Sequence, residues 1–391
     1  MPRPDRPTRP SARSGVAPFH VMEVLAAAKA RQRARGDALL LCTGQPATPA
    51  PRRVRAAAAA AAAEEVLGYT EAAGDPALRA AIAAWHRGRY GTAVTAGQVV
   101  VTTGVSGALI LVFLAALDPG DEVVLARPGY PAYRNTLAAL GAEVVELDCG
   151  PDTRHQLTAE MLAALPRPPR AVIVTSPDNP TGTIIDEAEL ARIARWCAAH
   201  GTLLVSDEIY HGIDYGRRCA SALESSAAAV VAGGFSKYFS MTGWRLGWLI
   251  LPEELVGPVT RLAANLTVCP PAVSQAAAAQ ALHPESLAEL DGHVRRYRDN
   301  RDLLLEGLAA AGIDRVAPAD GAFYLWADVS DYTDDSLVWC AELLDRTGVA
   351  LAPGVDFDAV HGGGRVRLCY AGAPGDLAEA CRRLSRVTGR A

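Results

Sequence analysis

Lysine is nearly absent from this chain: Lys29 and Lys237 are its two lysines, although Lys and Arg together number 38 among 391 residues. Arginine stays protonated, whereas a lysine amine in a desolvated site can lose its proton and condense with a carbonyl group. Lys237 lies in the segment 233–247, GGFSKYFSMTGWRLG. We predict that Lys237 is retained to form a Schiff base with an aldehyde cofactor. Taken alone, the observation fits a chance surface lysine equally well.

The chain also lacks the signatures of several other classes of protein. Its eight cysteines include no CxxC pair and no His/Cys cluster with zinc spacing, which predicts reduced thiols and no metal site. A formal net charge of −5 disfavours nucleic acid as the main partner. No window approaches the roughly 20 apolar residues of a membrane span, and the first fifteen residues lack the apolar run of a signal peptide. We therefore expect a cytoplasmic protein without a membrane partner, in which residues 1–15 form a disordered tail.

Short apolar strands alternate with amphipathic helices through the centre of the chain. This pattern predicts an α/β domain on a mostly parallel sheet that is buried on both faces. Helices are expected at 106–117, 132–140 and 187–200. The expected strands are at 98–103, 122–127, 143–148, 171–176, 203–207, 230–233 and 247–251.

The pattern changes beyond about residue 271. A long helix is expected at 286–311, then shorter strands at 322–326, 349–351 and 365–370, and a final helix at 376–387. These elements predict a second, smaller α+β domain, with which an N-terminal helix at 19–35 would pack. The expected division is a large domain at 46–275, and a small domain formed by 276–391 together with the segment 16–45.

Asp207 ends one of the predicted strands, at the edge where open α/β sheets bind ligands. A buried carboxylate needs a cationic partner, and a protonated pyridine nitrogen would serve. An acid that faces solvent and a metal ligand are the alternatives. Glu208 points to the opposite side of the strand and is expected to be structural. Tyr210 lies three residues beyond Asp207 and can donate a hydrogen bond to a ring hydroxyl oxygen.

Two further strand ends carry an amide and an aromatic ring. Asn179 lies between two prolines in the tight loop SPDNPTG, where it can donate to an oxygen or form an Asx-type turn. Tyr130, in the segment RPGYPAY, can offer its face to a flat ring or pack within its own turn.

An anion site is indicated where the first predicted strand runs through a glycine turn into a helix. Gly104 and Ser106 lie at this turn, and the amides of a helix N-terminus bind anions. Arg245 would add the positive charge that a phosphate requires. The segment VTTGVSGA is neither GxGxxG nor GxxxxGK, so NAD and ATP are disfavoured.

Together these residues resemble the class I and II aminotransferases, which are pyridoxal-phosphate enzymes of fold type I. The resemblance runs from about residue 16 to the C-terminus, and its most specific piece is SKYFSMTGWRLG at 236–247. It implies that Lys237 carries pyridoxal 5'-phosphate and later shuttles the proton. The other implied contacts are Asp207 with the pyridine nitrogen, Tyr210 and Asn179 with the phenolic oxygen, Tyr130 with the ring, and Gly104, Val105, Ser106 and Arg245 with the phosphate.

The resemblance also covers the segments that meet the partner subunit and the substrate. VLGYTEAAGDPALR at 66–79 is similar to the segment whose tyrosine, here Tyr69, reaches the neighbouring subunit's phosphate, which implies a homodimer. GRVRLCYA at 364–371 is similar to the strand whose arginine grips the substrate carboxylate. Position indicates Arg367, but Arg365 lies two residues away on the same face, and sequence alone does not separate them. Gly44 and Asn179 are also implied to lie beside the substrate.

One position departs from the family pattern. Relatives often have a serine that contacts the phosphate three residues before the lysine, and this chain has Gly234. Phosphate binding is then expected to depend more on Ser106 and Arg245, or on a water molecule.

The function that these expectations support is transfer of an amino group between an L-amino acid and a 2-oxo acid. Elimination, decarboxylation or oxidation on the same cofactor stays open, because the motifs specify the α-carbon better than the bond that breaks. A sensor domain of a regulator would need a DNA-binding module, for which the N-terminal tail leaves no room. Phe19 near the start of the matched region favours neutral or aromatic substrate side chains.

Overall fold

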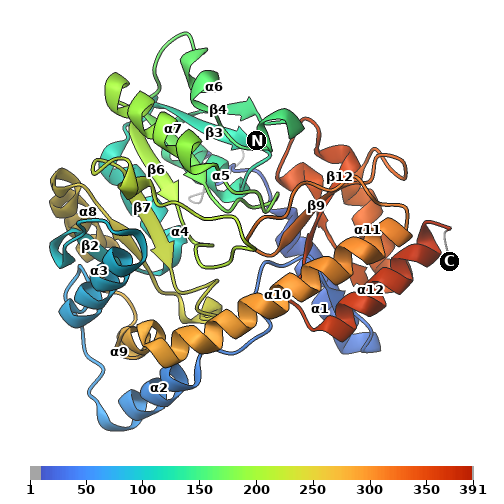
Figure 1. The fold of residues 1–391 in the computed structure, drawn as a ribbon, viewed down its shortest axis with the longest axis horizontal. Coiled ribbons are helices and arrows are strands. Elements are labelled where there is room, and N and C mark those ends of the chain that lie inside the picture. Colours follow the sequence, from blue (N-terminus) through green and yellow to red (C-terminus); the bar gives the residue numbers. More distant parts are fainter. Residues whose placement is uncertain (1–9, 390–391) are drawn as a thin grey trace, which may run out of the picture.

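The computed structural model describes residues 10–389, and its centre is a seven-stranded sheet (Figure 1). The strand order is β2-β8-β7-β6-β5-β3-β4; β8 runs antiparallel to both neighbours, and the other six share one direction. The prediction of a mostly parallel sheet is confirmed. Each strand lies within one residue of its expected ends: β2 (Val99–Thr102), β3 (Glu122–Arg127), β4 (Glu143–Asp148), β5 (Ala171–Thr175), β6 (Leu203–Asp207), β7 (Val230–Gly234) and β8 (Gly247–Ile250).

Burial explains why these strands read as continuous apolar runs. Every residue of β2, β5, β7 and β8 is buried, whereas the edge strand β4 is buried at no position and carries three charged side chains among its six residues. The helices of this part are α2 (Arg52–Glu64), α3 (Pro76–Tyr90), α4 (Gly104–Ala116), α5 (Pro131–Leu140), α6 (Ala159–Ala163), α7 (Glu187–His200), α8 (Glu253–Leu266) and α9 (Ala272–Ala278).

A second group of elements joins the two ends of the chain. Strands β11 (Ala352–Pro353), β12 (Arg365–Cys369) and β9 (Tyr324–Asp328) form a three-stranded antiparallel sheet. Strand β1 (Leu39–Leu40) pairs in parallel with β10 (Val349–Ala350), which brings the N-terminal segment against the C-terminal part. The helices here are α1 (His20–Arg35), α11 (Ser336–Thr347) and α12 (Pro374–Val387).

The long helix α10 (Pro284–Ala310) runs between the two groups, from the side of α2 and α9 to that of α1 and α12 (Figure 1). The domain boundaries at residues 45, 46, 275 and 276 stay a prediction. Residues 1–9 of the expected tail lie outside the described residues. Residues 10–15 contain a 3-10 turn at Ala12–Ser14 that buries no side chain.

Two features are absent from the described part of the chain. Within residues 10–389, no helix is both long enough and apolar enough to span a bilayer. The same residues contain no group of three or more His, Cys, Asp and Glu side chains arranged to hold a metal ion. All eight cysteines are free thiols, and seven of them are buried.

Candidate active site

A cavity of about 510 Å³ lies at the carboxyl ends of β5, β6 and β7, between the large sheet and the elements around β12. The carboxyl ends of parallel strands meet at one edge, which is why residues far apart in sequence converge here. Ten of the twelve residues expected at the site line this cavity: Gly44, Val105, Ser106, Tyr130, Asn179, Asp207, Tyr210, Lys237, Arg245 and Arg367. The other two do not line it: Gly104 is in contact with the lining residue Arg245, and Tyr69 is not among the lining residues.

Lys237 follows strand β7 and points its amine into the cavity. Its Nζ donates a hydrogen bond to the carbonyl oxygen of Gly44 at 2.7 Å. Burial lowers the pKa of Lys237 to about 8, and the positive charges of Arg367 and Arg245 act in the same direction. A substantial fraction of the amine is therefore neutral near physiological pH, as a nucleophile or a proton acceptor requires.

Asp207, the last residue of β6, is 3% exposed. Its Oδ1 accepts from the backbone N–H of Ile209 at 3.0 Å, and its Oδ2 accepts from the Tyr133 hydroxyl at 2.6 Å. Burial raises the pKa of Asp207 to about 6, against the effect of these two hydrogen bonds. Both donors are neutral, so a protonated ring nitrogen in front of the carboxylate would supply a cation that the hydrogen bonds do not.

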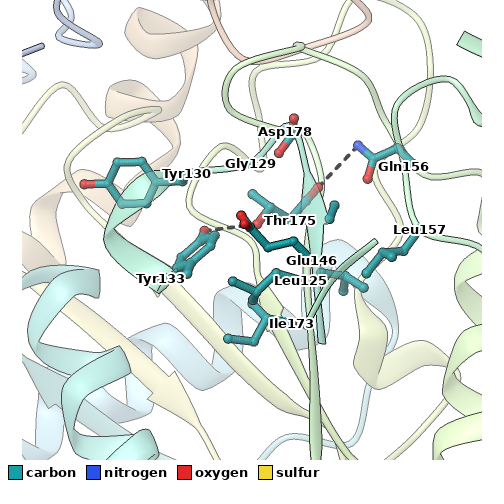
Figure 2. A pocket seen from close by; sticks show the side chains of 12 residues that line it. Leu125, Gly129, Tyr130, Tyr133, Glu146, Gln156, Leu157, Ile173, Thr175 and Asp178 are labelled. Atoms are coloured by element: carbon teal, nitrogen blue, oxygen red, sulfur yellow. Dashed lines mark hydrogen bonds between the residues drawn. The ribbon is translucent and has the colours of Figure 1, made fainter. Parts of the chain in front are cut away.

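Tyr133 is a residue that the sequence analysis missed. It lies in the first turn of α5, three residues after Tyr130, and the two rings pack edge to face with centroids 5.3 Å apart. Figure 2 shows Tyr133 beside Tyr130, with its hydroxyl directed at Thr175; the two oxygens are 3.0 Å apart. The spacing in YPAY was a usable signal, because residues three apart at a helix start face the same side.

Arg367 lies in the cavity, and Arg365 does not line it. Arg365 is bound in an ion pair with Asp328 on the neighbouring strand β9. Arg367 is 2% exposed; its Nη1 donates to Asn179 Oδ1 at 2.8 Å and its Nη2 to the carbonyl oxygen of Cys42 at 2.5 Å. These partners are uncharged, so the guanidinium keeps its positive charge available for a carboxylate.

Aromatic rings hold the Arg367 guanidinium in place. Tyr324 and Phe357 lie with their ring centroids 4.5 and 4.6 Å from its central carbon. The Tyr324 hydroxyl is 2.7 Å from that of Tyr210, so these two residues, 114 positions apart, form one unit. A Cβ on Gly44 would lie 1.7 Å from the Tyr324 oxygen, which explains why a glycine occupies that position.

The turn before α4, where the sequence predicts an anion site, adjoins the cavity. No side chain caps α4 at Thr103, so the amides of its first turn face the cavity without a side-chain acceptor. Gly104 has φ of +75°, and a Cβ there would lie 2.6 Å from Arg245 Nη2. The absence of this side chain lets the Arg245 guanidinium lie directly against the helix start.

The departure at Gly234 has a steric reason. A Cβ on Gly234 would lie 2.8 Å from Cδ1 of Ile209 and 3.0 Å from Cγ2 of Val105. Apolar side chains thus occupy the space that a serine would need. The larger share of phosphate binding expected for Ser106 and Arg245 stays a prediction.

Tyr69 does not line the cavity. Its side chain is 87% exposed, and Val66 and Leu67 beside it are 96% and 39% exposed. The role of Tyr69 across a subunit interface stays a prediction.

Comparison with known proteins gives consistent results over nearly the whole length. Residues 36–384 match the protein family described as aminotransferase class I and II. The chain is 54% identical over 378 residues to a valine–pyruvate aminotransferase of Mycobacterium tuberculosis, covering 96% of this chain and 97% of that protein. An aspartate/prephenate aminotransferase of Thermus thermophilus is 36% identical over 379 residues, with the same coverage of both chains. A crystal structure of an aminotransferase from Mycobacterium tuberculosis superposes with a TM-score of 0.96 at 54% identity, covering 98% of this chain and 99% of that one.

Proposed function

Because this chain belongs to the family of class I and II aminotransferases, we propose that its cavity takes pyridoxal 5'-phosphate and that Lys237 holds this cofactor covalently. One observation carries the proposal: Lys237 and Asp207 line the same cavity, where burial lowers the pKa of Lys237 and raises the pKa of Asp207. The relatives are named as aminotransferases, which supports transfer of an amino group over elimination, decarboxylation or oxidation.

The residues present fit each part of this cofactor. The carboxylate of Asp207 suits the pyridine nitrogen, and the aromatic face of Tyr130 suits the ring. Tyr210 and Asn179 line the cavity where the phenolic oxygen would need donors. The start of α4, with Gly104, Val105 and Ser106 beside Arg245, suits the phosphate.

The chain's own residues would then transfer the proton and bind the substrate. Bound pyridoxal phosphate supplies the electron sink for the electrons of the substrate Cα–H bond. When its amine is free, Lys237 would take the α-proton and later return it, because the lowered pKa of this amine allows it to act as a base near neutral pH. Arg367 binds the α-carboxylate, and its contacts with Asn179, Tyr324 and Phe357 fix the direction of the guanidinium.

Replacing Tyr133 with phenylalanine should shift the pH dependence of activity. The Tyr133 hydroxyl stabilises the ionised form of Asp207, so its loss raises the pKa of that carboxyl further above its usual range. A hydrogen bond to a charged group contributes about 1.5–3 kcal/mol and one pKa unit about 1.4 kcal/mol, so we expect the acid limb of kcat to rise by about one pH unit. Thr175→Val is the matched control, because it removes the other partner of Tyr133 and leaves the bond to Asp207. Equal shifts in both variants would contradict this role.

The lining of the cavity supports a substrate with an uncharged, aliphatic side chain. Phe19, Val21 and Met22 form an apolar wall of the cavity. Among the described lining residues, the basic side chains are Lys237, Arg245 and Arg367, and each already has a proposed role. Within residues 10–389, no further cation lines the cavity to meet a side-chain carboxylate. We propose valine and similar amino acids as donors and pyruvate as an acceptor, in line with the name of the relative that is 54% identical.

A panel of amino donors with pyruvate tests this assignment. We expect kcat/KM for valine to exceed that for aspartate by at least about tenfold, because an unpaired carboxylate in an apolar subsite costs more than the roughly 1.4 kcal/mol that a factor of ten represents. Formation of the 2-oxo acid product is the measurement. Equal or better use of aspartate would overturn the substrate class and leave the cofactor assignment intact.

A homodimer is proposed from the exposed segment around Tyr69. Val66, Leu67 and Tyr69 place three large apolar side chains close together at the surface, which is typical of an interface. Light scattering should give twice the protomer mass of 41.0 kDa for the protein with its cofactor. Tyr69→Phe should weaken pyridoxal phosphate binding and leave this mass unchanged. A monomeric holoenzyme would contradict the role of Tyr69.

A further inference from the structure

One short turn between β11 and β12 connects several walls of the cavity. It begins with the 3-10 turn Gly354–Asp356. The carbonyl oxygen of Phe357 accepts from the Gly129 N–H at 3.0 Å, and that of Asp356 accepts from Arg134 Nη2 at 2.8 Å. Gly129 and Arg134 flank Tyr130 in sequence, and the Phe357 ring packs on Arg367. The positions of Tyr130 and Arg367 are therefore both tied to this turn.

The side chain of Asp356 in the same turn reaches the start of α1. Phe19, at the position that precedes this helix, provides no side-chain cap. Asp356 supplies the cap from 336 and 335 residues away: its Oδ1 accepts from the His20 N–H at 3.0 Å and its Oδ2 from the Val21 N–H at 2.7 Å. The first amides of a helix have no partner within the helix, and a negative charge is favoured there. Asp356 is 3% exposed, so water competes little for these bonds.

The residues at this capped end are the apolar wall of the cavity. Phe19, Val21 and Met22 line it, and the Phe19 ring lies edge to face with Tyr130 at 6.0 Å. The direction in which α1 starts thus decides how far this wall stands from the substrate. Asp356 is not itself among the lining residues, so an effect of its replacement on substrate use has to pass through the helix or through the turn that contains Asp356.

We propose that Asp356 is a positioning residue for the substrate side-chain subsite, which it organises by capping α1. The proposal rests on the proposed function, because it assumes that Phe19, Val21 and Met22 face the side chain of the amino donor. A branched donor such as valine reaches this wall with its two methyl groups, and alanine carries one methyl group and reaches it less. A change in the position of Phe19, Val21 and Met22 should therefore raise KM for valine more than KM for alanine.

The test is Asp356→Asn, which keeps the size of the side chain and loses its charge and one acceptor. Loss of a helix cap costs about 0.5–2 kcal/mol, so we expect KM for valine to rise about tenfold, while kcat and the KM for alanine change less than about twofold. Hydrogen exchange of the amides of residues 20–22, read by mass spectrometry without substrate, should accelerate. Asp356→Glu, which retains both carboxylate oxygens, should restore slow exchange at least in part.

Asp186→Asn is the matched control. Asp186 caps α7 by accepting from the Ala188 N–H at 3.0 Å, and no residue of α7 lines the cavity. Its replacement should lower stability without changing the ratio of valine to alanine use. An unchanged ratio in Asp356→Asn, an equal change in Asp186→Asn, or unchanged exchange at residues 20–22 would overturn the proposal. If the unmodified protein used no amino donor at all, the proposed function would fail first, and the exchange result would still report separately on the cap.

Discussion

Replacing Lys237 with alanine is expected to lower turnover by at least about 10⁴-fold, because general acid–base catalysis alone contributes about 10²–10⁴-fold and the covalent attachment is lost as well. The fold should persist, since the side chain points into a cavity and makes a single hydrogen bond, to Gly44. Steady-state rates with valine and pyruvate measure the loss. Circular dichroism checks the fold, and the visible absorbance of protein incubated with pyridoxal phosphate reports on the attachment.

The scarcity of lysine makes the control unusually clean. Lys29, the one other lysine of the chain, lies exposed on α1. Lys29→Ala should therefore keep its turnover and its absorbance. After borohydride treatment in the presence of pyridoxal phosphate, mass spectrometry should find the label on Lys237. Normal turnover in Lys237→Ala, or a label confined to Lys29, would refute the assignment of the amine.

Replacing Asp207 with asparagine is expected to produce the second-largest loss. The amide oxygen can still accept from the Ile209 N–H, but the amide nitrogen that replaces Oδ2 cannot accept from Tyr133, and the side chain brings no charge to the ring nitrogen. Removing one partner of a buried ion pair costs about 3–5 kcal/mol, which corresponds to roughly 10²- to 10⁴-fold in rate. Single-turnover rates of the half-reaction with valine measure the effect, since they isolate the steps at the substrate α-carbon.

Glu208→Gln controls for the removal of a buried acid at the same strand end. Glu208 accepts hydrogen bonds from Ser206, Ser221 and the Ala222 N–H, and none of these residues lines the cavity. We expect this variant to lose stability and keep its half-reaction rate. A rate in Asp207→Asn close to that of the unmodified protein would show that Asp207 has been assigned the wrong role.

The seven strands of the large sheet could be predicted from the sequence because burial on both faces leaves a continuous apolar run. The orientation of β8 could not, because strand direction depends on partners and connections and not on composition. Strands β1 and β11, two residues each, are too short to show any periodicity. Helices with strong periodicity or caps, such as α7, were predicted to the residue.

In the candidate site too, residues marked by their local sequence could be predicted, and residues that depend on partners far away in the sequence could not. Lys237, Asp207 and Asn179 stand out because each is an unusual residue at a strand end. Tyr324 and Asp356 act through partners more than 100 positions away, and no local pattern marks them. The choice of Arg367 over Arg365 needed the pairing of Arg365 with Asp328, which depends on the register of β12 and β9.

The charges around the cavity carry a consequence for handling the protein. Three basic side chains, Lys237, Arg245 and Arg367, line it against the single carboxylate of Asp207 among the described residues. Small anions should therefore accumulate there, and phosphate or sulfate buffers should compete with loading of the cofactor, most strongly at low ionic strength, where screening is weakest.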